Sequence, residues 1–307
     1  MKLLNHDIGA LAKKTASEVL DDNILGLSAE TAYNFFFGLF PLLLFAGPLI
    51  SLIGDRVEIF NSILMWMAPS IPPEAFALVQ GVLRDVVFTK NAPGLMSLGA
   101  LLALWAGAGM FSSLMSALNA AYDVTESRPW WRQKLISIAC AIGSIIILLS
   151  ATTVMVAGEQ IVHLMARLLH LGTFGEVVWT IVQYLLAFAL VVLFMSMLYV
   201  VLPNVKQGAR SVVPGAIFAA LFWAVFTYAF RLYVTNFGSY NKTYGTIGAV
   251  IVLLTWMYWT SFAILTGGEL NSELHAGTGA VAGPDAGLGS GRVATHDGLP
   301  HSSAQPH

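Results

Sequence analysis

Six long stretches of this chain carry no charged side chain, and they constrain its fold more than any motif does. Each has about 20 residues or more, the length that an α-helix needs to cross roughly 30 Å of hydrocarbon. Because the membrane interior offers no water to the backbone, each crossing is expected to be an α-helix. The predicted fold class is therefore all-α, a polytopic membrane protein with six transmembrane helices and amphipathic outer segments. The six stretches are Thr31 to Gly54, Asn91 to Tyr122, Leu135 to Gly158, Val177 to Val205, Ser211 to Phe230 and Thr243 to Gly268.

The composition excludes an ordinary soluble protein. Hydrophobic residues make up 57% of the chain and charged residues only 10%, whereas a soluble domain is typically about a quarter charged. The formal net charge is -2. The sequence therefore offers no basic surface of the kind that binds nucleic acid, and no nucleic-acid partner is expected. The single cysteine, Cys140, cannot form an intrachain disulfide and is interpreted as a small core residue.

Motifs that carry enzyme chemistry are missing. The sequence has no glycine-rich phosphate loop, no G-x-S-x-G nucleophile elbow and no H-E-x-x-H zinc motif. The histidines at positions 296, 301 and 307 are irregularly spaced, which disfavours a metal site. We therefore expect no enzymatic activity, no cofactor and no bound metal.

The chain divides into three parts. Residues 1–28 are polar, with apolar residues near helical spacing from Ile8 to Leu20, which predicts a cytoplasmic interfacial helix. Residues 29–275 are expected to form the six-helix transmembrane domain. Residues 276–307 are rich in Gly, Ala, Ser and Pro, which predicts a disordered cytoplasmic tail. Prolines interrupt the segment from Asp55 to Lys90, so we expect a pair of interfacial helices there, on the outer side.

Basic residues in the loops predict the orientation. With six crossings both termini lie on one side, and that side collects most of the 15 basic residues. The bias is clearest in the short loops, where Lys206 and Arg210 stand without an acid and Arg128, Arg132 and Lys134 cluster. Both termini are therefore expected to be cytoplasmic.

Polar residues gather where the second crossing reaches the cytoplasm. Asn119 and Tyr122 lie about one helical turn apart, and the basic group of Arg128, Arg132 and Lys134 follows beside two tryptophans. Such a group at a membrane boundary can hold lipid phosphates. It can equally be a topology signal, and the sequence leaves both interpretations open.

The sixth crossing ends in an acid. It begins near Tyr244 and ends in a Gly-Gly pair followed by Glu269 and Asn271. A carboxylate at the end of a long apolar run is costly to bury and is usually paired or functional. Two interpretations stay open: a structural salt bridge with Arg128 or Arg132, or a role in transport. We count Tyr244, Glu269 and Asn271, with Asn119, Tyr122 and the basic group, as candidate substrate or headgroup contacts.

Two prolines lie inside the first crossing. Pro41 and Pro48 each lack an N–H and disturb the carbonyl group four residues earlier, which predicts helix kinks. Kinked membrane helices sometimes line cavities and sometimes only pack against their neighbours.

Several short strings, spread from about Ala29 to Asn271, resemble the YihY/BrkB family of bacterial inner-membrane proteins, once labelled ribonuclease BN. They are Phe40-Pro41, Leu104-Trp105, Ala117-Leu118-Asn119, Arg128-Pro129-Trp130, Leu202-Pro203-Asn204, Pro214-Gly215-Ala216, Tyr244 to Leu254 and Gly268-Glu269-Leu270-Asn271. The first crossing departs from the family pattern at Asn34-Phe35. The resemblance implies six helices in the bacterial inner membrane with both ends cytoplasmic.

The resemblance also points to movement of lipids or lipopolysaccharide precursors. Our leading hypothesis is a protein that translocates or exports a lipid or another amphipathic envelope component, with membrane lipids as partners. The alternative is a non-transporting scaffold of an envelope complex, with a homo-oligomer or another envelope protein as its partner. Ribonuclease activity is not expected, because no nuclease site can be assembled from these residues.

Overall fold

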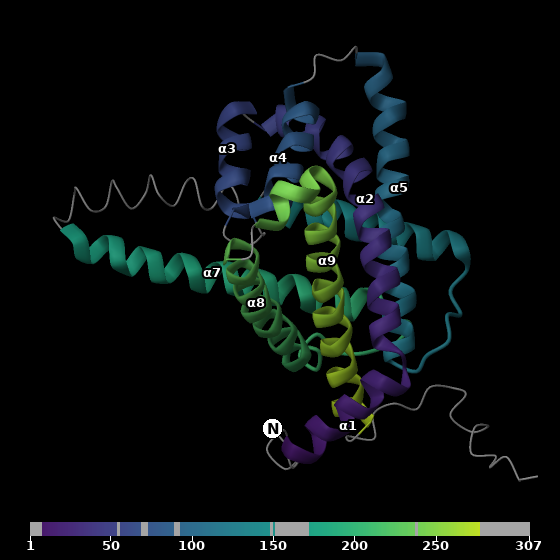
Figure 1. Ribbon diagram of the computed structural model, residues 1–307. Coiled ribbons are helices and arrows are strands. Elements are labelled where there is room, and N and C mark those ends of the chain that lie inside the picture. Colours follow the sequence, from purple (N-terminus) through teal and green to yellow (C-terminus); the bar gives the residue numbers. More distant parts are fainter. Residues whose placement is uncertain are drawn as a thin grey trace, which may run out of the picture.

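The computed structural model describes residues 8–53, 56–68, 73–88, 93–147, 150, 172–236 and 239–276. Every regular element in these ranges is helical, so the all-α prediction is confirmed for them. A further helical segment without a label covers residues 130–147. The labelled helices in Figure 1 are α1 (Ile8–Asp21), α2 (Ile24–Ile53), α3 (Arg56–Met67), α4 (Pro73–Phe88), α5 (Pro93–Ala121), α7 (Gly172–Val201), α8 (Val213–Asn236) and α9 (Ser239–Ala276).

Within the described residues, three helices are long and apolar enough to cross a membrane. They contain the segments Ile181–Val201, Val213–Thr235 and Ile247–His275, which match the last three predicted crossings. The first three predicted crossings include residues or side chains outside the described part of the chain. Six transmembrane helices are therefore not confirmed and stay a prediction. Residues 277–307 also lie outside the described ranges, so the disordered tail remains an expectation.

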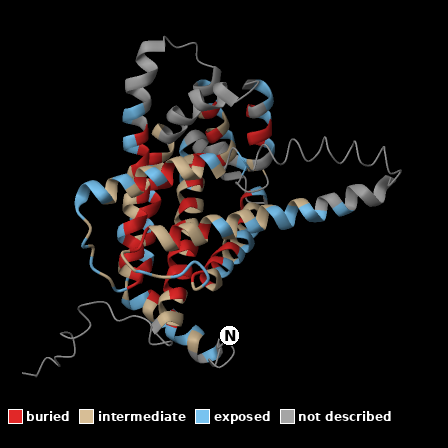
Figure 2. Cartoon of the chain, turned by 180° about the vertical axis from the view of Figure 1, so that it is seen from behind, coloured by how far each residue is buried: buried red, intermediate tan, exposed pale blue. Residues whose placement is uncertain are grey.

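The helices α2, α5 and α9 run side by side, and α4 packs against α2 and α9 (Figure 1). On the other side of α9 lies α8, which in turn contacts α7. The view in Figure 1 shows α7 running across the direction of α2, α5 and α9 and extending away from them. Only 17% of its span is buried inside the chain, and Figure 2 shows the described part of this extension as largely exposed.

Close helix contacts depend on small residues. A methyl group placed on Gly38 of α2 would lie 3.1 Å from Met110 Cβ and 3.4 Å from the carbonyl oxygen of Gly107, both in α5. The helix α2 continues through Pro41 and Pro48 without interruption. The side chain of Pro48 lies outside the described residues, and the kinks stay a prediction.

Two reciprocal hydrogen bonds join α8 to α9. Trp223 Nε1 donates to Thr260 Oγ1 at 3.2 Å, and Trp256 Nε1 donates to Thr227 Oγ1 at 3.2 Å. Each indole N–H thus finds a partner inside an apolar interface, where an unpaired donor would be costly. The contact fixes the register of the two helices that carry the candidate site.

The two helices predicted between Asp55 and Lys90 are present as α3 and α4, and their place on the outer side stays a prediction. They share a small apolar cluster of Phe60, Ile63, Leu64 and Leu83. Ala75 and Val79 of α4, however, belong to the main core. The segment is therefore packed into the fold and is not only interfacial.

A helix is also present in the N-terminal segment, as α1. Thr15 and Val19 are buried as the helical spacing predicts, but Leu20 is 68% exposed and does not belong to that face. The helix packs against α9, where Lys14 Nζ lies 2.6 Å from Glu273 Oε2. Asn23, with φ of 53°, turns the chain from α1 into α2.

Candidate functional site

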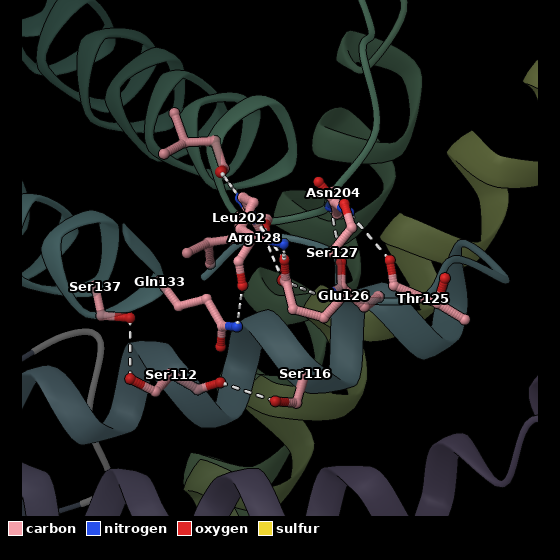
Figure 3. Close-up of polar contacts among 12 residues, drawn as sticks. Ser112, Ser116, Thr125, Glu126, Ser127, Arg128, Gln133, Ser137, Leu202 and Asn204 are labelled. Atoms are coloured by element: carbon pink, nitrogen blue, oxygen red, sulfur yellow. Dashed lines mark hydrogen bonds and ion pairs between the residues drawn. The ribbon is translucent and has the colours of Figure 1, made fainter. Parts of the chain in front are cut away.

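Arg128 and Glu126 form an ion pair in the loop after α5 (Figure 3). Arg128 Nη2 lies 2.7 Å from Glu126 Oε2, and Arg128 Nε donates to Glu126 Oε1 at 2.8 Å. This bidentate geometry is the strong form of an arginine–carboxylate contact. The hydrogen bonds from Arg128 lower the pKa of Glu126 to about 2, although partial burial opposes the shift.

The same arginine caps the end of α7. Arg128 Nη2 donates to the carbonyl oxygen of Leu202 at 2.6 Å, and Nη1 donates to that of Val201 at 3.4 Å. The last carbonyl groups of a helix have no partner within it, so an external donor is needed. The Arg128 side chain is only 10% exposed. It is therefore part of a structural clamp between the α5 loop and the end of α7.

Asn119 extends this clamp (Figure 3 shows the loop residues). Its Nδ2 donates to Glu126 Oε2 at 2.8 Å, and its Oδ1 accepts a hydrogen bond from the backbone N–H of Asn204 at 2.8 Å. Asn204 Nδ2 then donates to Ser127 Oγ at 2.8 Å and to the Thr125 carbonyl oxygen at 3.0 Å. The side-chain amides of Asn119 and Asn204 therefore both form hydrogen bonds within the protein.

The predicted basic group is not gathered at one point. Lys134 Nζ donates to the carbonyl oxygen of Trp105 at 2.9 Å and lies 4.5 Å from the centre of a Trp105 ring. Burial lowers the pKa of Lys134. Arg132 is exposed, whereas Arg128 is held in the clamp. The structure thus places these three residues in three different settings.

The helices α8 and α9 approach each other closely at two glycines, Gly215 and Gly267. A methyl group on Gly267 would lie 2.7 Å from the Gly215 carbonyl oxygen and 2.8 Å from Ala219 Cβ. Asn271 lies beside this contact and is fully buried. Its Oδ1 accepts from the Gly215 N–H at 2.8 Å, and its Nδ2 donates to the Val212 carbonyl oxygen at 3.0 Å. Asn271 therefore caps the first turn of α8 from a neighbouring helix.

Glu269 is buried next to this contact, with no basic partner among the described residues. Its side chain is 2% exposed, and its Oε2 atom has no hydrogen-bond partner among the described residues. Tyr122 is 6% exposed, and its hydroxyl also has no hydrogen-bond partner of ordinary geometry among the described residues, although it lies against Gln207 and Asn271. Groups buried in this way are costly and mark functional sites in membrane proteins.

Acids surround Glu269. The carboxyl group of Asp22, between α1 and α2, lies within hydrogen-bonding reach of Glu269, and Asp123 and Glu18 add negative charge nearby. Burial, followed by repulsion from Asp123, Glu18 and Asp21, raises the pKa of Asp22. The site is thus strongly acidic, and it suits a proton or a cation better than a phosphate.

The backbone places Asp123 at this site. The Val124 N–H donates to the Asn119 carbonyl oxygen at 2.9 Å, and the Asp123 N–H donates to that of Ala120 at 2.9 Å. These two bonds form a Schellman motif at the end of α5, in which Asp123 takes the left-handed conformation with φ of 51°. Glycine is the usual residue there, so this carboxylate occupies a position that disfavours most side chains.

Comparison with known proteins identifies the family. The family model described as Virulence factor BrkB matches residues 15–287. This chain belongs to the BrkB family. The resemblance predicted from the sequence is confirmed, and the chain is a bacterial membrane protein of the BrkB/UPF0761 group.

Relatives of this BrkB-family protein carry different names. The chain is 33% identical over 248 residues to the ribonuclease-like protein YfkH of Bacillus subtilis, covering 81% of this chain and 89% of YfkH. It is 26% identical over 261 residues to a UPF0761 membrane protein of Alteromonas mediterranea, covering 83% and 84%. A UPF0761 membrane protein of Klebsiella pneumoniae is 29% identical over 204 residues, covering 66% and 67%. No solved structure matches the chain.

The BrkB-family fold brings together some of the predicted site residues. Tyr122, Glu269 and Asn271 lie at one end of α9, as one group. Within the described residues Glu269 forms no ion pair with Arg128 or Arg132, so that sequence interpretation is wrong; its neighbours are acids. The side chain of Tyr244 lies outside the described residues.

Sequence reasoning missed the acids that face Glu269. Glu18, Asp22 and Asp123 lie in segments that read as polar loops or an amphipathic helix, and such acids are usually solvated. The one available signal was an acid immediately after each of two predicted helices. That signal is too common to single out a site.

Proposed function

We propose that this BrkB-family protein is an ion-driven membrane transporter that moves a lipid or another amphipathic envelope component across the bacterial inner membrane, with both termini cytoplasmic. The observation that supports the proposal is the burial of Glu269 without a cationic partner among the described residues, at the end of a helix long enough to span the membrane. A charge buried in a membrane protein needs a functional reason, because it destabilises the fold.

The acidic site favours a coupling role over headgroup binding. A lipid phosphate is an anion, and repulsion from Glu18, Asp22, Asp123 and Glu269 would oppose its binding at this end of α9. A proton or a cation would relieve that repulsion. The chain has no phosphate-binding loop for ATP, so an ion gradient is the proposed energy source.

The surfaces of α7, α8 and α9 are suited to an amphipathic substrate. Large apolar and aromatic side chains on these helices face outward, so acyl chains can remain in the bilayer while the protein handles only the polar part. Examples are Tyr184 at 72% exposed, Val225 at 69%, Tyr228 at 66% and Ile247 at 67%. Membrane lipids are thus the proposed partners, and no enzymatic step is part of the proposal.

One observation favours the alternative of a scaffold. The span in α7 is only 17% buried inside the chain, compared with 39% for the span in α9. A helix that makes so few contacts within its own chain can pack against a second copy or against another envelope protein. In that case α7 would be the interface.

A lipid-translocation assay separates the two functions. Purified protein is reconstituted in vesicles that carry a fluorescent lipid in both leaflets and an imposed proton or sodium gradient. Loss of fluorescence to an impermeant quencher then reports movement between leaflets. We expect the protein to accelerate that movement in a gradient-dependent way, and Glu269→Gln to abolish it while preserving the thermal midpoint. Wild-type vesicles no faster than empty ones, with and without a gradient, would rule out lipid translocation.

The control variant is Gly109→Ala. Gly109 lies in α5, and a methyl group there would meet nothing within 4 Å. Transport should be unchanged in this variant. If it fell as far as in Glu269→Gln, the loss would reflect general damage to the protein and not the acid.

A further inference from the structure

Two carboxyl groups that lie within hydrogen-bonding reach need a proton between them. Ionised carboxylates are acceptors only, so Asp22 and Glu269 cannot form a hydrogen bond unless one of them is protonated. Asp22 Oδ2 and Glu269 Oε2 both lack a donor among the described residues. A single acidic proton, covalently bound to one group and donated to the other, would satisfy both.

We propose that Asp22 and Glu269 share one proton, and that this pair is the site where a proton binds and leaves as the protein works. The inference rests on the proposed ion-driven transport for its purpose, and it names the coupling ion. Two carboxylates at one site cannot both be ionised without strong repulsion, which is why such pairs retain a proton at pH values where isolated acids lose theirs.

The surroundings favour a proton over a metal ion. No group of three or more His, Cys, Asp or Glu side chains able to hold a metal is found in the described ranges. Lys14, a basic residue near these acids, is already engaged by Glu273 at 2.6 Å, and that hydrogen bond raises the pKa of Lys14. The Lys14 side chain is 56% exposed and forms no ion pair with Asp22 or Glu269 among the described residues.

The charged and titratable groups around the pair come from several helices. From α1 come Lys14, Glu18 and Asp21, from the end of α5 come Tyr122 and Asp123, from α9 comes Glu273, and from α7 comes Tyr199. Tyr199 is not available as a proton donor to the pair, because its hydroxyl already donates to the Ile264 carbonyl oxygen at 2.7 Å. The Tyr122 hydroxyl has no hydrogen-bond partner of ordinary geometry among the described residues, and it lies on the buried side of the site.

The positions of the two acids define a route. Asp22 is half-buried and Asp123 is exposed, whereas Glu269 is only 2% exposed. A proton from cytoplasmic water would reach Asp22 first and Glu269 second. Release reverses this: one carboxyl O–H bond breaks, the proton passes to water, and the pair is left with two negative charges. Their repulsion would then push α1 and α9 apart, which links the protonation state to the packing of α1.

Infrared spectroscopy of the purified full-length protein tests the shared proton directly. We expect a protonated-carboxyl band in the wild type near neutral pH, one that disappears in Asp22→Asn and in Glu269→Gln. In each variant the new amide N–H can donate to the remaining carboxylate, so no proton is required. Absence of the band in the wild type would overturn the proposal without any variant. Its persistence in both folded variants would overturn it as well.

The pH dependence of stability provides a second measurement. The folded pair retains a proton that unfolded carboxyl groups have lost, so the folded state binds more protons and stability should fall as pH rises above about 4, the ordinary pKa of a carboxyl group. The raised pKa of Asp22 predicts the same fall in stability with rising pH. Both variants should show a flatter profile, whereas Glu30→Gln, at an exposed acid of α2, should keep the wild-type slope. A flat profile in the wild type contradicts the pair.

Together with the infrared measurement, the transport assay distinguishes a failure of this inference from a failure of the proposed function. A protonated-carboxyl band without lipid movement would support the pair and refute lipid transport. Lipid movement driven by a proton gradient without the band would support transport and overturn the pair. Movement driven by sodium alone, with the wild-type band unchanged by sodium, would show that the shared proton is not the coupling ion and would refute the proposal.

Discussion

Replacing Arg128 by Gln should destabilise the folded protein by about 3 kcal/mol. Arg128 makes a bidentate contact with Glu126 and donates to the carbonyl groups of Val201 and Leu202 at the end of α7. Removing one partner of a buried ion pair costs roughly 3–5 kcal/mol, because the other charge stays behind. Glu126 is 21% exposed and keeps its hydrogen bond from Asn119, which places the loss at the lower end of that range.

The acid–base behaviour of Glu126 leads to the same magnitude for the stability that the ion pair contributes. Its pKa lies at about 2 in the folded protein, against an ordinary value of 4.5. At about 1.36 kcal/mol for each pH unit, that difference corresponds to at most roughly 3 kcal/mol in favour of the ionised form, and solvent screening at this partly exposed loop lowers it. Because the folded pKa is depressed, the stabilisation is fully present above about pH 4.5 and is lost as pH falls towards 2.

Equilibrium unfolding in mixed detergent micelles measures this prediction. The wild type should lose stability between about pH 4.5 and pH 2, whereas Arg128→Gln should be less stable at neutral pH and show a flatter acid profile. Arg128→Lys should recover part of the loss, because an ammonium group keeps the charge but cannot make the bidentate contact and also cap α7. Arg132→Gln is the matched control, since Arg132 is exposed, and it should leave stability unchanged.

One result would refute the structural clamp. If Arg128→Gln kept the wild-type free energy of unfolding and bound less anionic lipid, Arg128 would be a headgroup ligand, as one interpretation of the sequence proposed. The contacts of Arg128 with Glu126 and with the end of α7 would then not represent its role in the membrane.

Three other changes test separate parts of the structure. Gly267→Ala should lower stability by about 2 kcal/mol in an unfolding assay, because the methyl group would overlap α8, while Gly109→Ala should be neutral or gain up to about 1 kcal/mol of helix propensity. Asn271→Ala should cost roughly 3 kcal/mol, measured the same way, because two buried backbone groups lose their partners; wild-type stability would show that the α8 cap is dispensable. A cysteine at Ala280 should resist an impermeant thiol reagent in intact cells and one at Pro73 should react, and the opposite pattern would reverse the predicted orientation.

The helical class of this protein could be predicted from the sequence because one physical requirement decides it. Backbone groups in hydrocarbon must bond within their own segment, so long charge-free runs become helices whatever their neighbours are. The last three crossings follow this rule and recur as spans in α7, α8 and α9. Short-range features were also predictable, among them a helix before the first crossing and two helices in the proline-interrupted outer segment.

Side-chain partners could not be predicted in the same way. Helical spacing indicates which face of α9 carries Glu269, but it says nothing about which helix packs on that face. The meeting of Asp22, Asp123 and Glu269 depends on the packing of α1 and α2 against α9, and on a left-handed residue that ends α5. Charge alone suggested an arginine partner, since opposite charges attract, and that expectation was wrong.

The basic group is a second case in which the sequence did not predict the side-chain partners. Arg128, Arg132 and Lys134 share a sign and a stretch of sequence, so the sequence presents them as one feature. The tertiary structure separates them, because the end of α7 brings unpaired carbonyl groups to Arg128 and α5 brings the Trp105 carbonyl to Lys134. Sequence by itself determined where this protein is apolar and therefore helical, since hydrophobicity belongs to each segment. Only the tertiary structure decided which polar groups are satisfied and which remain buried without a partner, since that depends on residues far apart in the chain.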